Sequence, residues 1–205
     1  LGEYTGIEIG GAGSAEAKGS MATPEFAERN GLEWTDGQTL TAAIGQSYSL
    51  FTPLQLANYV ATLAGGGTRY NAHLLKEVRT YDSAELVDVY DEPPAEIIDI
   101  EPENLQAVLQ GMRDLVVSGS VAYYFKDCVV DAAAKTGTAQ TGGKVSNGVF
   151  VAFAPYDDPQ IALAVVIEKG GSGGALASTA VQILNAYFTS VDEAKAVVGE
   201  NMLIQ

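Results

Sequence analysis

The sequence has few of the residues that build metal and disulfide sites. The 205-residue chain contains one cysteine, Cys128, and one histidine, His73. A single cysteine cannot close an internal disulfide, and no His/Cys spacing typical of zinc is present. We expect Cys128 to be a small buried apolar residue rather than a reactive thiol, and we expect no catalytic role for His73.

Positive charge is also scarce. Lysine and arginine total 11 against 26 aspartates and glutamates, which gives a formal net charge of −15. This charge repels phosphate backbones and anionic lipids, so nucleic acid is not an expected partner. Much of the acid lies between residues 82 and 103, and we interpret it as a solvated surface.

Long apolar runs are absent as well. The longest, residues 161–167, has the length of a strand and not the roughly 18 residues of a membrane helix. The chain begins at Leu1 without a signal-peptide pattern. We therefore expect it to be a piece of a longer protein.

Two segments have clear helical patterns. Residues 52–55, Thr-Pro-Leu-Gln, form a capping box that predicts a helix start. The glycines at 65–67 permit the left-handed backbone that ends many helices. A second helix begins at Pro102, and its apolar residues follow the i, i+3, i+4, i+7 spacing of a core-facing stripe. Residues 1–33 show little periodicity, and we interpret them mainly as surface loop.

Strand patterns occupy much of the remaining chain, at residues 74–80, 85–90, 129–138, 147–154 and 161–168. The first two predict a small hairpin, and the last three, joined by short turns, predict an antiparallel meander. The third strand of this meander is apolar on both faces, so we expect it to be central and covered.

The predicted sheet is followed by helical sequence. We expect residues 170–174 to form a flexible glycine-rich loop, residues 178–188 to form a helix on the sheet, and residues 192–198 to add a helical turn or two. The pattern as a whole predicts an α+β fold with an antiparallel sheet packed against helices.

The chemistry of the chain is concentrated in Lys135-Thr136-Gly137-Thr138. Strand alternation places the two threonines on one face, where their hydroxyls can bind a substrate carboxylate, and Lys135 on the other, where it supplies positive potential. Gly137 leaves room for another backbone to pair as an added strand, and the N–H of Thr138 can point at a developing oxyanion. Taken alone, the triplet is interpreted as a strand end running into a turn, because three residues recur by chance, and only its context favours a binding site.

Several segments, in order, resemble class B penicillin-binding proteins. Residues 43–57 are similar to the family's AIGQG…TPLQLA element, and residues 134–140 resemble GKTGTAQ, with Ala134 in place of the usual glycine. Residues 150–155 are similar to FVGFAP, and residues 5–9 to the start of TGIDLPGE. In β-lactamases and penicillin-binding proteins the Lys-Thr-Gly triplet accompanies upstream Ser-x-x-Lys and Ser-x-Asn elements.

The resemblance implies the C-terminal part of a transpeptidase domain, residues 1–190, followed by a tail at 191–205 that can include a short helix. It implies a serine D,D-transpeptidase that cross-links peptidoglycan stem peptides and is acylated by β-lactams. Lys135 and Thr138 would then be catalytic, and Lys135, Thr136, Gly137 and Thr138 would bind substrate. No metal and no cofactor are implied.

The resemblance also implies what this chain does not carry. Ser-x-x-Lys and Ser-x-Asn are absent, so the nucleophile helix and the first sheet strands of the transpeptidase fold are expected upstream, and the piece alone is expected to be inactive. The whole protein would be anchored at the outer face of the bacterial cytoplasmic membrane with other cell-wall synthesis proteins. The unpaired sheet edge predicts self-association. A non-catalytic sensor or scaffold, and a β-lactamase, remain the alternatives.

Overall fold

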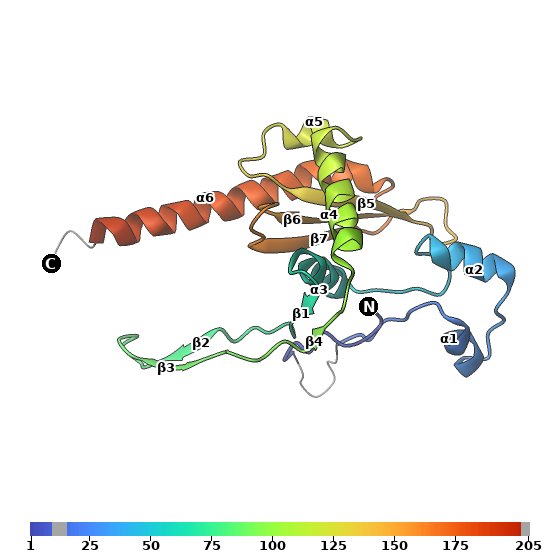
Figure 1. Cartoon of the computed structure of the whole chain (residues 1–205), viewed down its shortest axis with the longest axis horizontal. Coiled ribbons are helices and arrows are strands. Elements are labelled where there is room, and N and C mark those ends of the chain that lie inside the picture. The colour runs from blue at the N-terminus through green and yellow to red at the C-terminus, as the bar shows by residue number, and fades with distance from the viewer. Residues whose placement is uncertain (10–15, 202–205) are drawn as a thin grey trace. The chain divides into compact units, whose positions relative to one another are not determined.

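The computed structural model describes residues 1–9 and 16–190 in full, together with the helical backbone as far as residue 201 (Figure 1). These residues form two compact units, Leu1–Ile100 and Glu101–Gln205. Within the described part of the chain, no helix is both long enough and apolar enough to cross a membrane.

The first unit holds short helices and two small antiparallel sheets. Strand β1 pairs with β4, and β2 pairs with β3. The elements are α1 (Pro24–Arg29), α2 (Asp36–Ala43), α3 (Pro53–Ala64), β1 (Thr68–Arg69), β2 (Glu77–Arg79), β3 (Leu86–Val89) and β4 (Glu96–Ile97). The predicted hairpin is confirmed as β2–β3, although both strands are shorter than expected.

The prediction that residues 1–33 are mainly loop is wrong at α1. Thr23 caps this helix by accepting a hydrogen bond from the N–H of Phe26 at 3.1 Å, and Pro24 occupies its first turn. Thr35 caps α2, which the sequence pattern also missed, by accepting from Gln38 at 3.3 Å. Both helices are short and bury almost no side chains, so their sequences contain no apolar stripe that would predict a helix.

Helix α3 begins where the capping box predicts. The Thr52 hydroxyl accepts from the Gln55 N–H at 3.1 Å, and the Gln55 side-chain oxygen accepts from the Thr52 N–H at 3.0 Å. The Gln55 amide also donates to the carbonyls of Glu3 and Lys18, at 2.6 and 2.7 Å. The left-handed residues at its end are Gly66 and Gly67, since the C-cap Gly65 has a φ of −83°.

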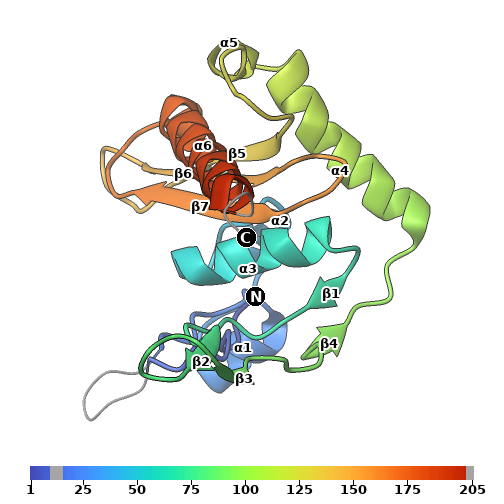
Figure 2. The same cartoon turned by 90° about the vertical axis from the view of Figure 1, so that its left-hand side faces the viewer.

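The second unit is a three-stranded sheet with helices on one face (Figure 2). Its elements are α4 (Pro102–Val117), α5 (Ala122–Phe125), β5 (Ala133–Ala139), β6 (Asn147–Ala154), β7 (Ile161–Ile167), the 3-10 turn η1 (Gly173–Leu176) and α6 (Ala177–Asn201). The strand order β5-β6-β7, antiparallel throughout, confirms the predicted meander.

The prediction that the third strand is central is wrong for the described sheet, in which β6 is central and β7 lies at an edge. Short turns make consecutive strands neighbours, so the third strand of a meander lies at its edge whatever its composition. Most residues of β7 are at least partly covered, and Leu163 is buried. The apolar composition of β7 therefore reflects this burial and does not indicate where the strand lies in the sheet.

One hydrophobic cluster joins the sheet to its helices. It includes Val116 from α4, Phe150 and Ala152 from β6, Leu176 from η1 and Leu184 from α6. The α4 stripe is only partly core-facing, because Met112 and Val116 are buried while Val108 is 49% exposed.

Helix α6 joins the two helical segments that the sequence pattern separates, 178–188 and 192–198, into one helix. The predicted boundary after residue 190 falls within α6 and stays a prediction. Residues 202–205 of the expected tail lie outside the described residues.

Candidate active site

The candidate residues lie on β5, an edge strand of the described sheet. In register, Lys135 is opposite Val151, Thr136 opposite Phe150, and Thr138 opposite Gly148. Since Ala134 and Phe150 belong to the core cluster, Thr136 and Thr138 point to the helix-covered face and Lys135 to the other. The outer edge of β5 pairs with no other described strand, so an extended peptide has a free edge to join.

Lys135 carries a solvent-exposed ammonium group. Its Nζ donates a hydrogen bond to the Thr136 carbonyl at 2.6 Å. Among the ion pairs of the described residues, none involves Lys135. The positive charge is therefore available to an anionic ligand.

A close backbone contact supports the middle of β5. A Cβ atom placed on Gly173 would lie 2.1 Å from the Gly137 carbonyl oxygen and 2.3 Å from that of Val149. The Gly173 N–H donates a long hydrogen bond of 3.4 Å to Thr138 Oγ1, which leaves the hydroxyl proton of Thr138 free to bind another group. Only glycine at position 173 permits this approach.

The prediction of a flexible loop at residues 170–174 is therefore wrong for its second half. Gly173 and Gly174 belong to η1, which Ser172 caps by accepting from the Gly174 N–H at 3.3 Å. On the helix-covered face, Gly173 packs against the backbone of Gly137. On the Lys135 face, a Cβ atom placed on Gly137 would lie 3.3 Å from the Val149 side chain.

Two polar side chains that were not predicted from the sequence bind the segment that leads into β5. Arg113 of α4 donates to the Ala132 carbonyl at 2.8 Å and forms an ion pair with Asp131. Asn185 of α6 accepts from the Val129 N–H and donates to the Asp127 carbonyl, both at 2.9 Å. Neither contact has a sequence signal, because each joins residues that are far apart along the chain.

The contacts of Cys128 and His73 are packing and stacking contacts with neighbouring residues. Cys128 is half-buried against the core cluster, and this burial raises the pKa of its thiol. The His73 ring stacks on Tyr90 with 3.5 Å between ring centroids, and its Nδ1 lies 2.7 Å from the Leu75 carbonyl oxygen. No group of acidic, histidine or cysteine side chains in the described residues is arranged to hold a metal ion.

Comparison with known proteins shows which family the sequence matches. Residues 9–187 match the family model described as the penicillin binding protein transpeptidase domain. The peptidoglycan D,D-transpeptidase MrdA of Escherichia coli K12 is 31% identical over 203 residues, which cover 90% of this chain and 31% of that protein. Penicillin-binding protein 2A of Bacillus subtilis 168 is 36% identical over 157 residues, which cover 70% of this chain and 22% of that protein. The chain thus spans less than a third of the length of these relatives.

Solved structures show the same fold. A complex between penicillin-binding protein PBP2 and MreC from Helicobacter pylori matches with a TM-score of 0.76 at 26% identity, covering 92% of this chain and 33% of that one. Pseudomonas aeruginosa PBP2 in complex with WCK 5153 matches with a TM-score of 0.71 at 33% identity, covering 84% of this chain and 38% of that one. These matches confirm the predicted fold class.

Proposed function

The chain belongs to the penicillin-binding protein transpeptidase family, and from this premise we propose that it is the C-terminal part of a peptidoglycan D,D-transpeptidase domain. The observation that carries the proposal is the edge strand β5, which presents the exposed Lys135 ammonium and the Thr138 hydroxyl beside a free strand edge. An extended, anionic stem peptide is the kind of ligand that such an edge fits.

The chemistry proposed for the whole protein is acyl transfer through a serine that lies outside this chain. The serine oxygen forms a bond to a carbonyl carbon of one stem peptide, and the terminal residue leaves as a protonated amine. An amine of a second stem peptide then displaces the serine and completes the cross-link. β-Lactams would acylate the same serine.

Each residue of the motif has a role in this scheme. A substrate that lies along the free edge of β5 can be contacted from both faces of the strand. Lys135 supplies positive potential for the substrate carboxylate and the attacking serine from one face, and the hydroxyls of Thr136 and Thr138 bind the carboxylate from the helix-covered face. Gly137 allows the substrate backbone to approach this edge closely. The N–H of Thr138 donates to the developing oxyanion, an interaction typically worth about 2.7–4 kcal/mol of the barrier.

The location and partners of the whole protein are part of the proposal. We place it at the outer face of the bacterial cytoplasmic membrane, held by a segment outside this chain. Other cell-wall synthesis proteins are the expected partners, in line with the similar Helicobacter pylori PBP2, whose structure was solved with MreC.

The proposal is tested by acylation of the full-length protein with fluorescent penicillin. Wild type should form a covalent adduct, and Lys135→Ala should be labelled about 10²–10³-fold more slowly, because a charge aimed at the reacting groups is lost. Gln140→Ala, an exposed position just beyond β5, is the matched control and should keep the wild-type rate.

Other outcomes would contradict the proposal. A well-folded full-length protein that takes up no label would favour the sensor or scaffold alternative, and sustained nitrocefin hydrolysis would identify a β-lactamase. Covalent labelling of the 205-residue chain alone would show that the nucleophile lies within it.

A further inference from the structure

A cavity in the first unit has the features of a small-molecule site. It has a volume of about 150 Å³ and is lined by the N-terminal segment, α3 and the β1–β4 pair, including Thr5, Thr62, Arg69, Glu96 and Ile98. A cavity of this volume has room for several waters or for one ligand of amino-acid size.

Thr5 lines this cavity and carries a buried polar group without a hydrogen-bond partner. The residue is 3% exposed, and its Oγ1 is buried without any hydrogen-bond partner. Its backbone is satisfied, since its N–H donates to the Glu16 carboxylate at 2.7 Å and its carbonyl accepts from Ala72 at 2.9 Å. A buried hydroxyl without a partner is costly, so a ligand that pairs with it gains that free energy.

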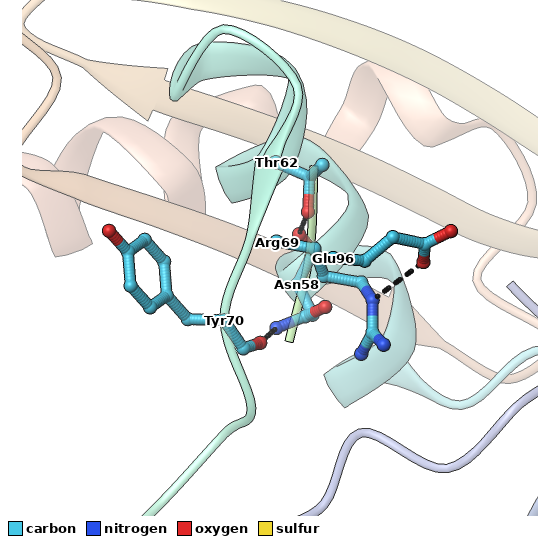
Figure 3. A network of polar contacts seen from close by, with 5 residues as sticks. All are labelled: Asn58, Thr62, Arg69, Tyr70 and Glu96. Carbon is cyan, nitrogen blue, oxygen red and sulfur yellow. Dashed lines mark hydrogen bonds and ion pairs between the residues drawn. The ribbon is translucent and has the colours of Figure 1, made fainter. Parts of the chain in front are cut away.

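Arg69 contributes unused hydrogen-bond donors. Its Nε donates to Glu96 at 3.3 Å, and Figure 3 shows the two terminal nitrogens pointing away from that carboxylate. The terminal nitrogens bond to no residue of the described chain. The Arg69 side chain is only 28% exposed, whereas that of Glu96 is 58% exposed. The free fork of a guanidinium matches the two oxygens of a carboxylate.

Thr62 contributes an acceptor beside these donors. It is 4% exposed, and its hydroxyl proton is committed to the Asn58 carbonyl at 2.8 Å (Figure 3). The Asn58 amide is in turn held by the Tyr70 carbonyl at 2.9 Å. Thr62 Oγ1 can therefore accept a hydrogen bond from a ligand N–H.

We propose that this cavity binds a small N-acylated amino acid or the last residue of a peptide. The ligand carboxylate accepts from the terminal nitrogens of Arg69 and, after a rotation about the Thr5 Cα–Cβ bond that brings the buried hydroxyl to the cavity, from Thr5. The ligand amide N–H donates to Thr62 Oγ1. A single negative charge fits better than a phosphate dianion, because the carboxylates of Glu3 and Glu96 also line the cavity and repel a dianion more strongly than a monoanion.

The test uses N-acetylglycine as the probe and the full-length protein, with binding followed by saturation-transfer NMR and calorimetry. The neutral N-acetylglycinamide is the matched ligand and should bind at least about tenfold more weakly, since it lacks the carboxylate. All measurements are repeated in a Lys135→Ala background, which removes a second carboxylate-binding group on β5. The inference therefore stands or falls separately from the proposed transpeptidase activity.

Variants assign the contacts. Thr5→Val and Arg69→Gln should each lower the affinity for N-acetylglycine at least about tenfold, whereas Thr5→Ser should keep the wild-type affinity. Without ligand, Thr5→Val should leave the unfolding midpoint unchanged or raise it, because it removes an unpaired buried hydroxyl. Stronger binding of a short peptide such as Gly-Gly-Gly than of N-acetylglycine would identify a chain end as the ligand, and weaker binding a free acyl amino acid.

Three results would overturn the inference. The first is equal affinity for N-acetylglycine and its amide. The second is full retention of N-acetylglycine affinity by a folded Arg69→Gln protein. The third is a lower ligand-free midpoint for Thr5→Val with unchanged affinity, which would show that only water occupies the cavity.

Discussion

At the scale of single residues, the candidate site depends on two glycines in contact. Gly137 lies on the strand that carries the motif, and Gly173 lies directly against its backbone on the helix-covered face. The sequence alone points to Gly137 because it belongs to a recognisable motif. Gly173 was missed because its importance comes from a contact between distant segments, and a glycine-rich run is also typical of flexible loops.

We predict that Gly173→Ala destabilises the second unit. The added methyl group would lie 2.1 Å from the Gly137 carbonyl oxygen, so η1 must move away from β5. Overpacking of this kind typically costs about 1–3 kcal/mol, and the acylation rate should fall with it. Gly174→Ala is the control, since its nearest atoms would be 3.6 Å away, and both variants are compared by thermal unfolding. Equal midpoints for the two variants would refute the contact.

A second prediction at this scale concerns the Cys128 thiol. Burial raises its pKa, with the nearby Asp131 charge acting in the same direction and a backbone hydrogen bond at Val130 acting against them. A raised pKa leaves less reactive thiolate at any pH below it. Iodoacetamide should therefore alkylate the native protein more slowly at pH 7 than the urea-unfolded protein, with the native rate still rising above pH 9. The same rate in both states would contradict this expectation.

At the scale of elements, local signals predict what is locally determined. The start of α3 and the bounds of β6 follow from capping and alternation, which involve only neighbouring residues. Helices α1 and α2 have threonine caps but no apolar stripe, so periodicity cannot reveal them. The β1–β4 pair is two residues long on each side and is fixed by partners far apart in the chain.

The capping box of α3 gives a prediction at this scale. Thr52→Ala removes one cap and should cost about 1 kcal/mol in urea unfolding, while Thr52→Ser should cost little. Gln55→Ala also removes the donors to the carbonyls of Glu3 and Lys18. Its cost should exceed that of Thr52→Ala by about 1–3 kcal/mol, the penalty for buried polar groups left unpaired. Equal losses would mean that Gln55 acts only as a cap.

At the scale of the whole molecule, the described sheet of the second unit has β5 at one edge and β7 at the other. The family match, the fold class and the motif strand were accessible from the sequence, because short motifs recur in a fixed order along the chain. The position of β7 could not be predicted from the sequence, because an apolar strand has the same composition at an edge as in the middle of a sheet. Its outer edge pairs with no strand among the described residues.

We predict that the 205-residue chain, prepared alone, self-associates through the β7 edge. Sedimentation should show an average mass that rises with protein concentration, and added salt should increase it because the net charge of −15 is then screened. Ile167→Lys, at the end of β7, should reduce association. Ile183→Lys on α6 is the matched control, since Ile167 and Ile183 are 44% and 40% exposed. An equal effect of both variants would exclude the strand edge.

The tethers at the start of β5 have a mechanical consequence. Arg113 and Asn185 fasten the segment that enters the strand, and Gly173 backs its middle, but the residues that leave it, from Gln140 through Lys144, are exposed. Segments with few buried contacts open at a lower free energy than well-packed ones. Local opening of β5 should therefore start at residues 140–144 and reach its fastened beginning last.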